Sequence, residues 1–518
     1  MSRDEVLIVG AGPVGLSLGI LLARQGVPFQ IIDQTTSQAK DSRAAGIQPR
    51  TLEVFEDMEI LMPFLQEGVK VVGVNIFSGQ DRLLHAVYEG FDAPYPFIID
   101  LPQRETERIL IEHLDVNVQR ETALNNLELH DTHVEVMLKK GADDFASEEF
   151  AYVVGCDGAR STCRKLLEIP FPGSEYPAHW IVLDAKVTWD FDSQEINIFP
   201  HGDGIVATFP LPKDRMRITI ERKAGDETPP SFELALQRMR ERISPAIELE
   251  EPADLSPFII HHRQAASYRK ERVFLAGDAA HLHSPAGGQG MNTGIQDAYN
   301  LAWKLGLVMK GIGQEALLDT YHKERHPIAK EVLALTDRMT KIMTVKSPAL
   351  SFIRNAFMTI AGSLDILKKP LPKRLSQLYL SYGKSDIIVD DAGEHTPSAI
   401  EVGKRAPDHC VSQNGKEMRL FDLFKGTHHT LLQFGGKKGA HDFYSVSHPE
   451  VRTYHLYRDR STFQTPESLL DVEPSAHTHY GISKPTAVLV RPDGYIGYIQ
   501  SPLHQKGFET YLQKVFCS

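Results

Sequence analysis

Residues 6–15 read Val-Leu-Ile-Val-Gly-Ala-Gly-Pro-Val-Gly, an apolar run that passes directly into a glycine-rich turn. The apolar part predicts a buried parallel strand, and residues 16–24 predict a helix packed on that strand. The turn itself is Gly10-Ala11-Gly12-Pro13-Val14-Gly15. Its glycines permit a tight bend and let backbone N–H groups approach a pyrophosphate at the positive end of the helix.

The next strand ends in an acidic residue. Residues 29–32 form a second apolar run, and Asp33 follows it eighteen residues after Gly15, with Gln34 next. A carboxylate at this place can bind a ribose 2′-hydroxyl. A glycine-rich turn alone is often only structural, but strand, turn, helix, strand and acid within about thirty residues predict a dinucleotide site. The pattern does not distinguish NAD from FAD.

A second glycine-rich segment lies far along the chain. Residues 272–276 predict another buried strand, and Gly277-Asp278 stands at its carboxyl end, where ligands of open α/β sheets bind. Residues 289–305 have helical spacing, so the glycines of residues 287–290 open a helix N-terminus that suits an anion or a polar ring edge. The simpler alternative is an ordinary turn before a buried helix. Together the two segments suggest one long cofactor held at both ends.

These segments resemble motifs of the single-component, FAD-dependent aromatic hydroxylases, the class A flavoprotein monooxygenases. Three motifs follow the family's order over about 290 residues. They are the turn at residues 10–15 with Asp33, the segment 153–161 followed by Arg164, and the segment 277–292. The second is similar to the family's Asp-Gly motif, which touches FAD and also serves nicotinamide binding. The chain most resembles the phenol hydroxylase and polyketide hydroxylase branch.

The resemblance also implies which residues contact FAD. Asp278 would bind the ribityl chain, and the glycine-rich turn after it would support the pyrimidine side of the flavin. Arg43 would lie against FAD, Gln103 would contact the phosphate and ribityl region, and Leu124 would offer backbone on the adenine side. Pro285 would line the reactive face of the flavin. The complete expected set is Gly10, Ala11, Gly12, Pro13, Val14, Gly15, Asp33, Gln34, Arg43, Gln103, Leu124, Asp157, Gly158, Asp278, Pro285, Gly287, Gly288, Gly290, Met291 and Asn292.

The chemistry implied by the resemblance resides in the cofactor. NADPH or NADH would reduce FAD, O₂ would form a flavin C4a-hydroperoxide, and one oxygen atom would pass to a phenolic or polyketide-like aromatic substrate. Because no second G-x-G-x-x-G unit occurs, the nicotinamide would dock transiently. Phenol hydroxylases carry an aspartate near residues 44–46, where this chain has Ala45. Either the base that deprotonates the phenol lies elsewhere in this chain, or the substrate ionises without a base. No catalytic residue is therefore assigned.

Two alternatives remain open beside this hydroxylase reading. A flavin halogenase would carry a W-x-W-x-I-P segment, and Trp180, Trp189 and Trp303 are too dispersed to supply one. A non-catalytic FAD protein that binds an aromatic ligand is opposed by the intact motifs around both ends of the flavin.

The length of 518 residues predicts two or three domains in an α/β fold. A Rossmann-like FAD-binding domain is expected from residues 1–170 and 263–340. An antiparallel β-sheet substrate domain is inserted at 171–262, with added strands expected from 71–100. A helical segment and linker cover 341–400. The resemblance implies a thioredoxin-like domain at 401–518, without C-x-x-C, that serves packing or dimerisation, so a homodimer stays open.

Composition excludes several other classes. The net charge of −12 argues against a nucleic acid partner. No apolar run approaches the roughly twenty residues of a membrane span, and residues 1–5 are too short and polar for a signal peptide, so a cytoplasmic protein is expected. The four cysteines form no C-x-x-C pair or metal-ligand cluster, so we expect reduced thiols and no metal.

Overall fold

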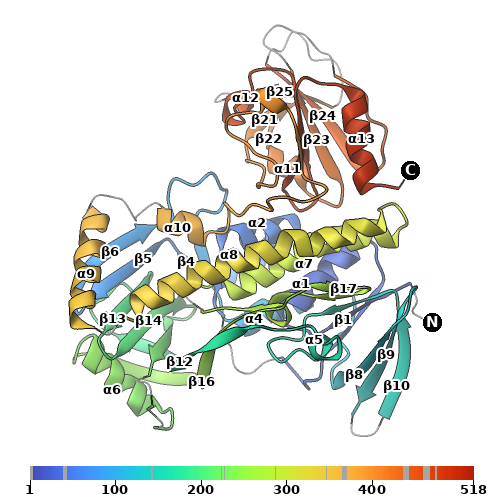
Figure 1. Cartoon of the computed structure of the whole chain (residues 1–518). Coiled ribbons are helices and arrows are strands. Elements are labelled where there is room, and N and C mark those ends of the chain that lie inside the picture. The colour runs from blue at the N-terminus through green and yellow to red at the C-terminus, as the bar shows by residue number, and fades with distance from the viewer. Residues whose placement is uncertain are drawn as a thin grey trace.

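The protein is described by a computed structural model (Figure 1). The described residues are 4–38, 44–141, 144–222, 225–226, 228–285, 287–345, 347–363, 370–435, 443–458, 467–472 and 475–517. Figure 1 shows a larger N-terminal part and a C-terminal unit that sits on one side of it.

A five-stranded sheet forms the centre of the N-terminal part, with the order β17-β18-β11-β1-β2. Its strands are β1 Val6–Val9, β2 Phe29–Ile32, β11 Tyr152–Gly155, β17 Arg269–Lys270 and β18 Val273–Leu275. Four strands are parallel and β17 is an antiparallel edge. The helix α1 (Pro13–Arg24) packs against α7 (Gly290–Met309). The predicted Rossmann-like arrangement of apolar strands and a crossing helix is therefore confirmed.

A second sheet has eight strands in the order β19-β16-β12-β15-β14-β13-β5-β6. Its bounds are β5 Gly73–Ser78, β6 Asp81–Val87, β12 Gly173–Thr188, β13 Ile196–His201, β14 Gly204–Leu211, β15 Arg215–Glu221, β16 Glu248–Gln264 and β19 His281–Leu282. Most neighbours are antiparallel, but β13 pairs in parallel with β5, which comes from an earlier part of the chain. The helix α6 (Phe232–Arg242) shares an apolar core with one face of this sheet.

Two small sheets complete the N-terminal part. One has the order β3-β7-β4, with β3 Gly46–Ile47, β4 Val69–Val71 and β7 Ile98–Asp100. Of the added strands expected from 71–100, β5 and β6 lie in the eight-stranded sheet, whereas β7 lies in this small sheet. The other is the meander β8 (Thr122–Leu129), β9 (Val134–Lys140) and β10 (Asp144–Phe150).

Most of the remaining helices surround these sheets. They are α2 Pro49–Asp57, α3 Leu61–Glu67, α4 Gln103–Glu112, α5 Thr162–Leu166, α8 Asp319–Met343, α9 Pro348–Ser363 and α10 Pro370–Leu375. In Figure 1, α7 and α8 cross the middle of the molecule and α9 lies at its outer edge beside β6.

The C-terminal unit is built on an eight-stranded sheet with the order β20-β27-β26-β23-β24-β25-β21-β22. The strands are β20 Val389–Asp391, β21 Cys410–Gln413, β22 Lys416–Arg419, β23 His429–Phe434, β24 Val451–Tyr457, β25 Ser468–Asp471, β26 Thr486–Val490 and β27 Ile496–Gln500. Its helices are α11 Leu420–Phe424, α12 Ala476–His479 and α13 Gln505–Val515. Parallel strands β23 to β25 beside the hairpin of β26 and β27 are consistent with the expected thioredoxin-like fold. The sheet also includes β20, which precedes residue 401.

Candidate functional site

The first glycine-rich turn closes against β11 and leaves the start of α1 open. Gly10 has a φ of +107°, and a Cβ there would lie 2.4 Å from the backbone oxygen of Cys156. A Cβ on Gly15 would lie 2.0 Å from the backbone oxygen of Gly10. Within the described residues no side chain caps α1 at Gly12, and a Cβ there would meet nothing within 4 Å. The turn therefore presents helix N–H groups toward open space, as a pyrophosphate site requires.

Asp33 is held beside this turn. Its Oδ2 accepts a hydrogen bond from the backbone N–H of Ala11 at 2.8 Å, and its Oδ1 accepts one from the backbone N–H of Thr35 at 2.8 Å. These bonds fix the carboxylate at the end of β2, next to the turn. The adjacent Gln34 is exposed. A ribose bound at the turn would therefore meet a carboxylate that is already oriented.

The two glycine-rich segments meet at the side chain of Val14. A Cβ on Gly277 would lie 2.8 Å from Val14 Cγ2, and a Cβ on Gly294 would lie 2.6 Å from the same atom. Gly277 also has a φ of +61°. The absence of side chains at both glycines lets α1 and the start of α7 come together. The two helix N-termini consequently belong to one site.

The Asp-Gly motif is tied to the same place. Asp157 Oδ2 accepts hydrogen bonds from the backbone N–H groups of Thr162 (2.6 Å) and Cys163 (3.1 Å), so this oxygen holds the first turn of α5. Its Oδ1 is buried and has no hydrogen-bond partner in the part of the chain that the structure describes. Gly158 continues the turn with a φ of +73°. Arg164 Nη1 donates to the backbone oxygen of Ala279 at 2.8 Å, which links this motif to the 277–279 turn containing exposed Asp278.

The second glycine-rich turn is held by side-chain amides. Gly287 and Gly288 have φ values of +79° and +63°. Asn292 Nδ2 donates to the backbone oxygens of Gly46 (2.8 Å) and Gly288 (2.7 Å), and its Oδ1 accepts from the backbone N–H of Gln48 (2.8 Å). The Asn292 side chain is thus already hydrogen-bonded within the protein. A bound flavin would instead meet the backbone N–H groups of Gly290, Met291 and Asn292, in the uncapped first turn of α7.

Other predicted residues are placed less directly. Gln103 opens α4, where its Nε2 donates to Glu107 Oε1 at 2.9 Å and its Oε1 accepts from the backbone N–H of Ala44 at 3.4 Å. The side chain of Leu124 is buried in the main core, so only its backbone can face a ligand. Pro285 is exposed just before the glycine turn. Arg43 lies outside the described residues.

A buried charge cluster that the sequence did not indicate supports the 277–281 segment. Asp297, on α7, accepts hydrogen bonds from the backbone N–H of Gly277 (3.1 Å) and from Arg325 Nε (2.7 Å), and it pairs with His281 Nε2 (2.7 Å). Burial raises the pKa of the Asp297 carboxyl, but Arg325 and His281 lower it more, so the net pKa lies below its ordinary value. Asp297 lies inside the predicted helix of residues 289–305, but an acidic residue there does not reveal its buried partners, which only the fold brings together.

Two further titratable residues near the site were also missed. Burial lowers the pKa of His283 to about 4, so its imidazole is neutral near pH 7. A Cβ on Gly290 would lie 3.4 Å from its Cε1, which places the ring against the glycine turn. Asp100 on β7 pairs with Gly46 of β3, is fully buried, and has no hydrogen-bond partner among the described residues for either carboxylate oxygen. Burial raises its pKa to about 7, although Arg217 opposes the shift.

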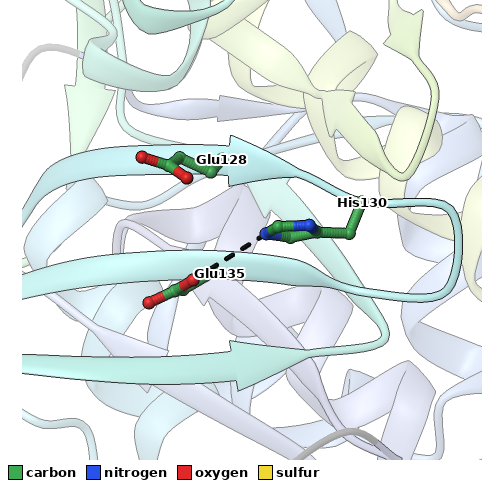
Figure 2. Close-up of side chains that lie close together, drawn as sticks. All are labelled: Glu128, His130 and Glu135. Carbon is green, nitrogen blue, oxygen red and sulfur yellow. Dashed lines mark ion pairs between the residues drawn. The ribbon is translucent and has the colours of Figure 1, made fainter.

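One cluster of metal-ligand side chains lies elsewhere in the described part of the chain. Glu128, His130 and Glu135 project from the β8–β9 hairpin, with His130 Nε2 3.8 Å from Glu135 Oε2 (Figure 2). The side chains of His130 and Glu135 are 40% and 43% exposed. We interpret the group as a solvated ion pair, because exposed acidic groups are common without a metal and no further ligand converges on this group within the described residues.

Comparisons with known proteins show the family to which the chain is related. A family model described as FAD binding domain matches residues 3–336, and one described as aromatic-ring hydroxylase, C-terminal matches residues 400–518. The rifampicin monooxygenase of Streptomyces venezuelae is 31% identical over 509 residues, which cover 95% of this chain and 98% of that protein.

Solved structures are similar over nearly the whole length. The anhydrotetracycline hydroxylase OxyS from Streptomyces rimosus has a TM-score of 0.76 and 29% identity, with 99% of both chains covered. The ternary complex of aklavinone-11 hydroxylase with FAD and aklavinone has a TM-score of 0.80 and 25% identity, with 98% of both chains covered.

The match of the FAD-binding model to more than half of the chain and the full-length relatives confirm the resemblance noted in the sequence. With its two glycine-rich segments in contact at Val14, the chain belongs to the family of FAD-dependent aromatic-ring hydroxylases, which are flavoprotein monooxygenases.

Proposed function

We propose that this monooxygenase hydroxylates a phenolic, polyketide-like aromatic substrate, with NAD(P)H and O₂ as co-substrates. The observation that carries the proposal is the meeting of both glycine-rich segments at Val14, beside a β-sheet with an apolar face. The similarity to a rifampicin monooxygenase and to an anhydrotetracycline hydroxylase supports a multi-ring substrate. The cytoplasmic location expected from the sequence stays a prediction. Within the described residues, no helix combines the length and apolar character that crossing a bilayer requires.

The residues present fit FAD. The open turn before α1 and oriented Asp33 would hold the adenosine and pyrophosphate half, and Asp278 with the first turn of α7 would hold the flavin half. The orphaned Oδ1 of Asp157 is a further buried acceptor for the cofactor or the nicotinamide. When bound, FAD supplies hydride acceptance and oxygen activation, while the protein orients the substrate and excludes water.

The substrate would lie against the eight-stranded sheet. One apolar cluster unites Trp180, Ile205 and Ile260 with half-buried Ile198 and with Met343 at the end of α8. A neighbouring cluster contains Tyr88 and Ile98 with Phe209. The two clusters share half-buried Ile198, and together we call them the apolar wall. Such a wall would suit a large planar ring system, which gains free energy by burying its faces.

The test uses purified holoenzyme, NADPH, ¹⁸O₂ and two substrate series, simple phenols and fused-ring polyphenols. We expect fused-ring compounds to accelerate NADPH oxidation and to acquire one ¹⁸O atom, measured by mass spectrometry. Binding of the aromatic compounds without ¹⁸O in any product would overturn the proposal and favour a ligand-binding flavoprotein. Turnover of simple phenols alone would correct the substrate class.

We also propose a homodimer formed through α9. Leu350, Ile353, Phe357 and Ile360 recur at three- and four-residue spacing and are each between 55% and 60% exposed, whereas Met358 faces the body of the protein. With Phe352 this stripe exposes on the order of several hundred Å² of apolar surface, comparable with one side of a stable interface.

The charge pattern favours a second copy over a lipid surface. Arg354 is the one charged residue in the α9 sequence, and it is buried, with its Nη1 donating to the backbone oxygen of Met343 at 3.0 Å. Interfacial helices usually carry Lys and Arg on their polar face, whereas helix pairs need an uncharged apolar seam.

A further inference from the structure

The turn between β26 and β27 brings buried charges of the C-terminal unit into the N-terminal part. This turn is Arg491-Pro492-Asp493-Gly494, and the side chains of Arg491 and Asp493 are fully buried. Arg491 makes two hydrogen bonds to Glu324 on α8, at 2.8 and 2.9 Å. Asp493 Oδ2 accepts a hydrogen bond from Asn300 Nδ2 on α7 at 3.1 Å. Figure 1 shows the C-terminal unit resting above these helices.

A second set of contacts reaches the first turn of α2. Arg50 Nη2 donates to the backbone oxygen of Asp493 at 2.7 Å, and its guanidinium lies 5.1 Å from the centre of the Tyr495 ring. Arg50 Nη1 also pairs with Glu53 Oε2 at 2.8 Å. Glu53 in turn receives two hydrogen bonds from Arg405 of the C-terminal unit, at 2.7 and 2.8 Å. The side chains of Arg50, Glu53 and Arg405 each have at most 6% of their surface exposed.

The opposite side of the same turn holds the predicted flavin segment. Gln48 precedes Arg50 by two residues, and its backbone N–H donates to Asn292 Oδ1 at 2.8 Å. Gln48 Nε2 donates to the backbone oxygen of Gly287 at 2.9 Å. The start of α2 is therefore bonded to the C-terminal unit through Arg50 and to the 287–292 turn through Gln48.

We propose that Arg50 and Glu53 are positioning residues through which the docked C-terminal unit sets the 287–292 turn for the flavin. This inference rests on the proposed role of that turn in FAD binding. A buried ionic contact suits the purpose because a bidentate guanidinium pair tolerates only one geometry, whereas an apolar contact could slide. The C-terminal unit thereby contributes to the cofactor site without touching the cofactor.

The chain offers a matched control on the same helix. Glu56 lies one turn beyond Glu53 and pairs with Arg419 of the C-terminal unit, so it contacts the same unit farther from Gln48. Glu53→Gln and Glu56→Gln make the same chemical change at the two ends of the interface. Arg50→Lys is a milder variant that keeps the charge but loses the planar fork, and it guards against failure of Glu53→Gln to fold.

The experiment measures the FAD dissociation constant of each full-length protein by fluorescence, together with the visible circular dichroism of the bound flavin. We expect Glu53→Gln and Arg50→Lys to weaken FAD at least tenfold and to alter the flavin dichroism. Glu56→Gln should stay within twofold of the wild type, even if its melting temperature falls.

Unchanged FAD affinity and dichroism in both Glu53→Gln and Arg50→Lys would overturn the inference. An equal loss in Glu56→Gln would also overturn it, because the effect would then be general loosening of the interface. If the wild type binds FAD but forms no oxygenated product, while the two variants show these shifts, the positioning role stands and only the proposed function fails.

Discussion

The buried carboxyl of Asp100 couples the stability of this chain to pH. Its pKa is raised from 3.8 to about 7, chiefly by burial, and the facing groups are Arg217, which lowers the pKa, and Tyr88. The folded state therefore binds this proton more tightly than the unfolded chain does. The resulting stability is fully present below about pH 4 and is lost as the pH rises through about 7.

Asp100→Asn should remove this pH dependence. Relative to the wild type, the variant should gain on the order of 3–4 kcal/mol between pH 4 and pH 8, because each pKa unit corresponds to about 1.4 kcal/mol. Thermal unfolding of both proteins at saturating FAD, at several pH values, checks this. Parallel stability curves for the two proteins would show that Asp100 ionises in the folded state as it does in the unfolded chain.

Single residues also show where sequence reasoning stops. The glycines at 10, 15 and 277 could be recognised because their motifs are local, and the structure gives each a steric reason. The buried carboxyl of Asp100 and the hydrogen bond between Gln48 and Asn292 could not be recognised in the sequence, since only the fold brings their surroundings together. The assignment of individual residues to FAD contacts stays a prediction.

Packing of α1 on α7 makes a prediction about Gly294. A Cβ there would lie 2.6 Å from Val14 Cγ2 and 3.0 Å from Gly277 Cα, so Gly294→Ala should separate the helices and cost about 1–3 kcal/mol, with weaker FAD binding. Gly306→Ala on the same helix is the control, because its new methyl would meet mainly the flexible end of Gln25. Thermal melts and FAD titrations compare the two variants. Equal, small effects would contradict a tight contact at Val14.

Whole elements were predictable where their pattern was periodic and their neighbours were local. The strands and helices of the cofactor turns correspond to the apolar runs in the sequence. The sheet to which each strand of residues 69–100 belongs could not be predicted, because β4 pairs with β7 and β5 pairs with β13, which lie elsewhere in the chain. The β20 strand likewise joins the C-terminal sheet only by pairing with β27, more than a hundred residues later.

At the level of the assembled protein, the exposed stripe of α9 predicts a concentration-dependent dimer. Ile353→Glu and Phe357→Glu each place a charge in the exposed stripe of α9, so each variant should be monomeric. Both should keep bound FAD, because these side chains face away from the protein body. Phe145→Glu is the matched control, since Phe145 is 50% exposed on β10 and should leave the dimer intact.

Light scattering after size-exclusion chromatography, over a hundredfold range of protein concentration, measures the oligomer. A wild type that is monomeric throughout that range would contradict the proposed dimer. A dimer that persists in both Ile353→Glu and Phe357→Glu would also contradict it. Co-sedimentation with vesicles of anionic lipid tests whether the exposed stripe of α9 binds a membrane instead. If the wild type is monomeric and binds the vesicles, and Ile353→Glu does not bind them, the stripe is a membrane-binding surface.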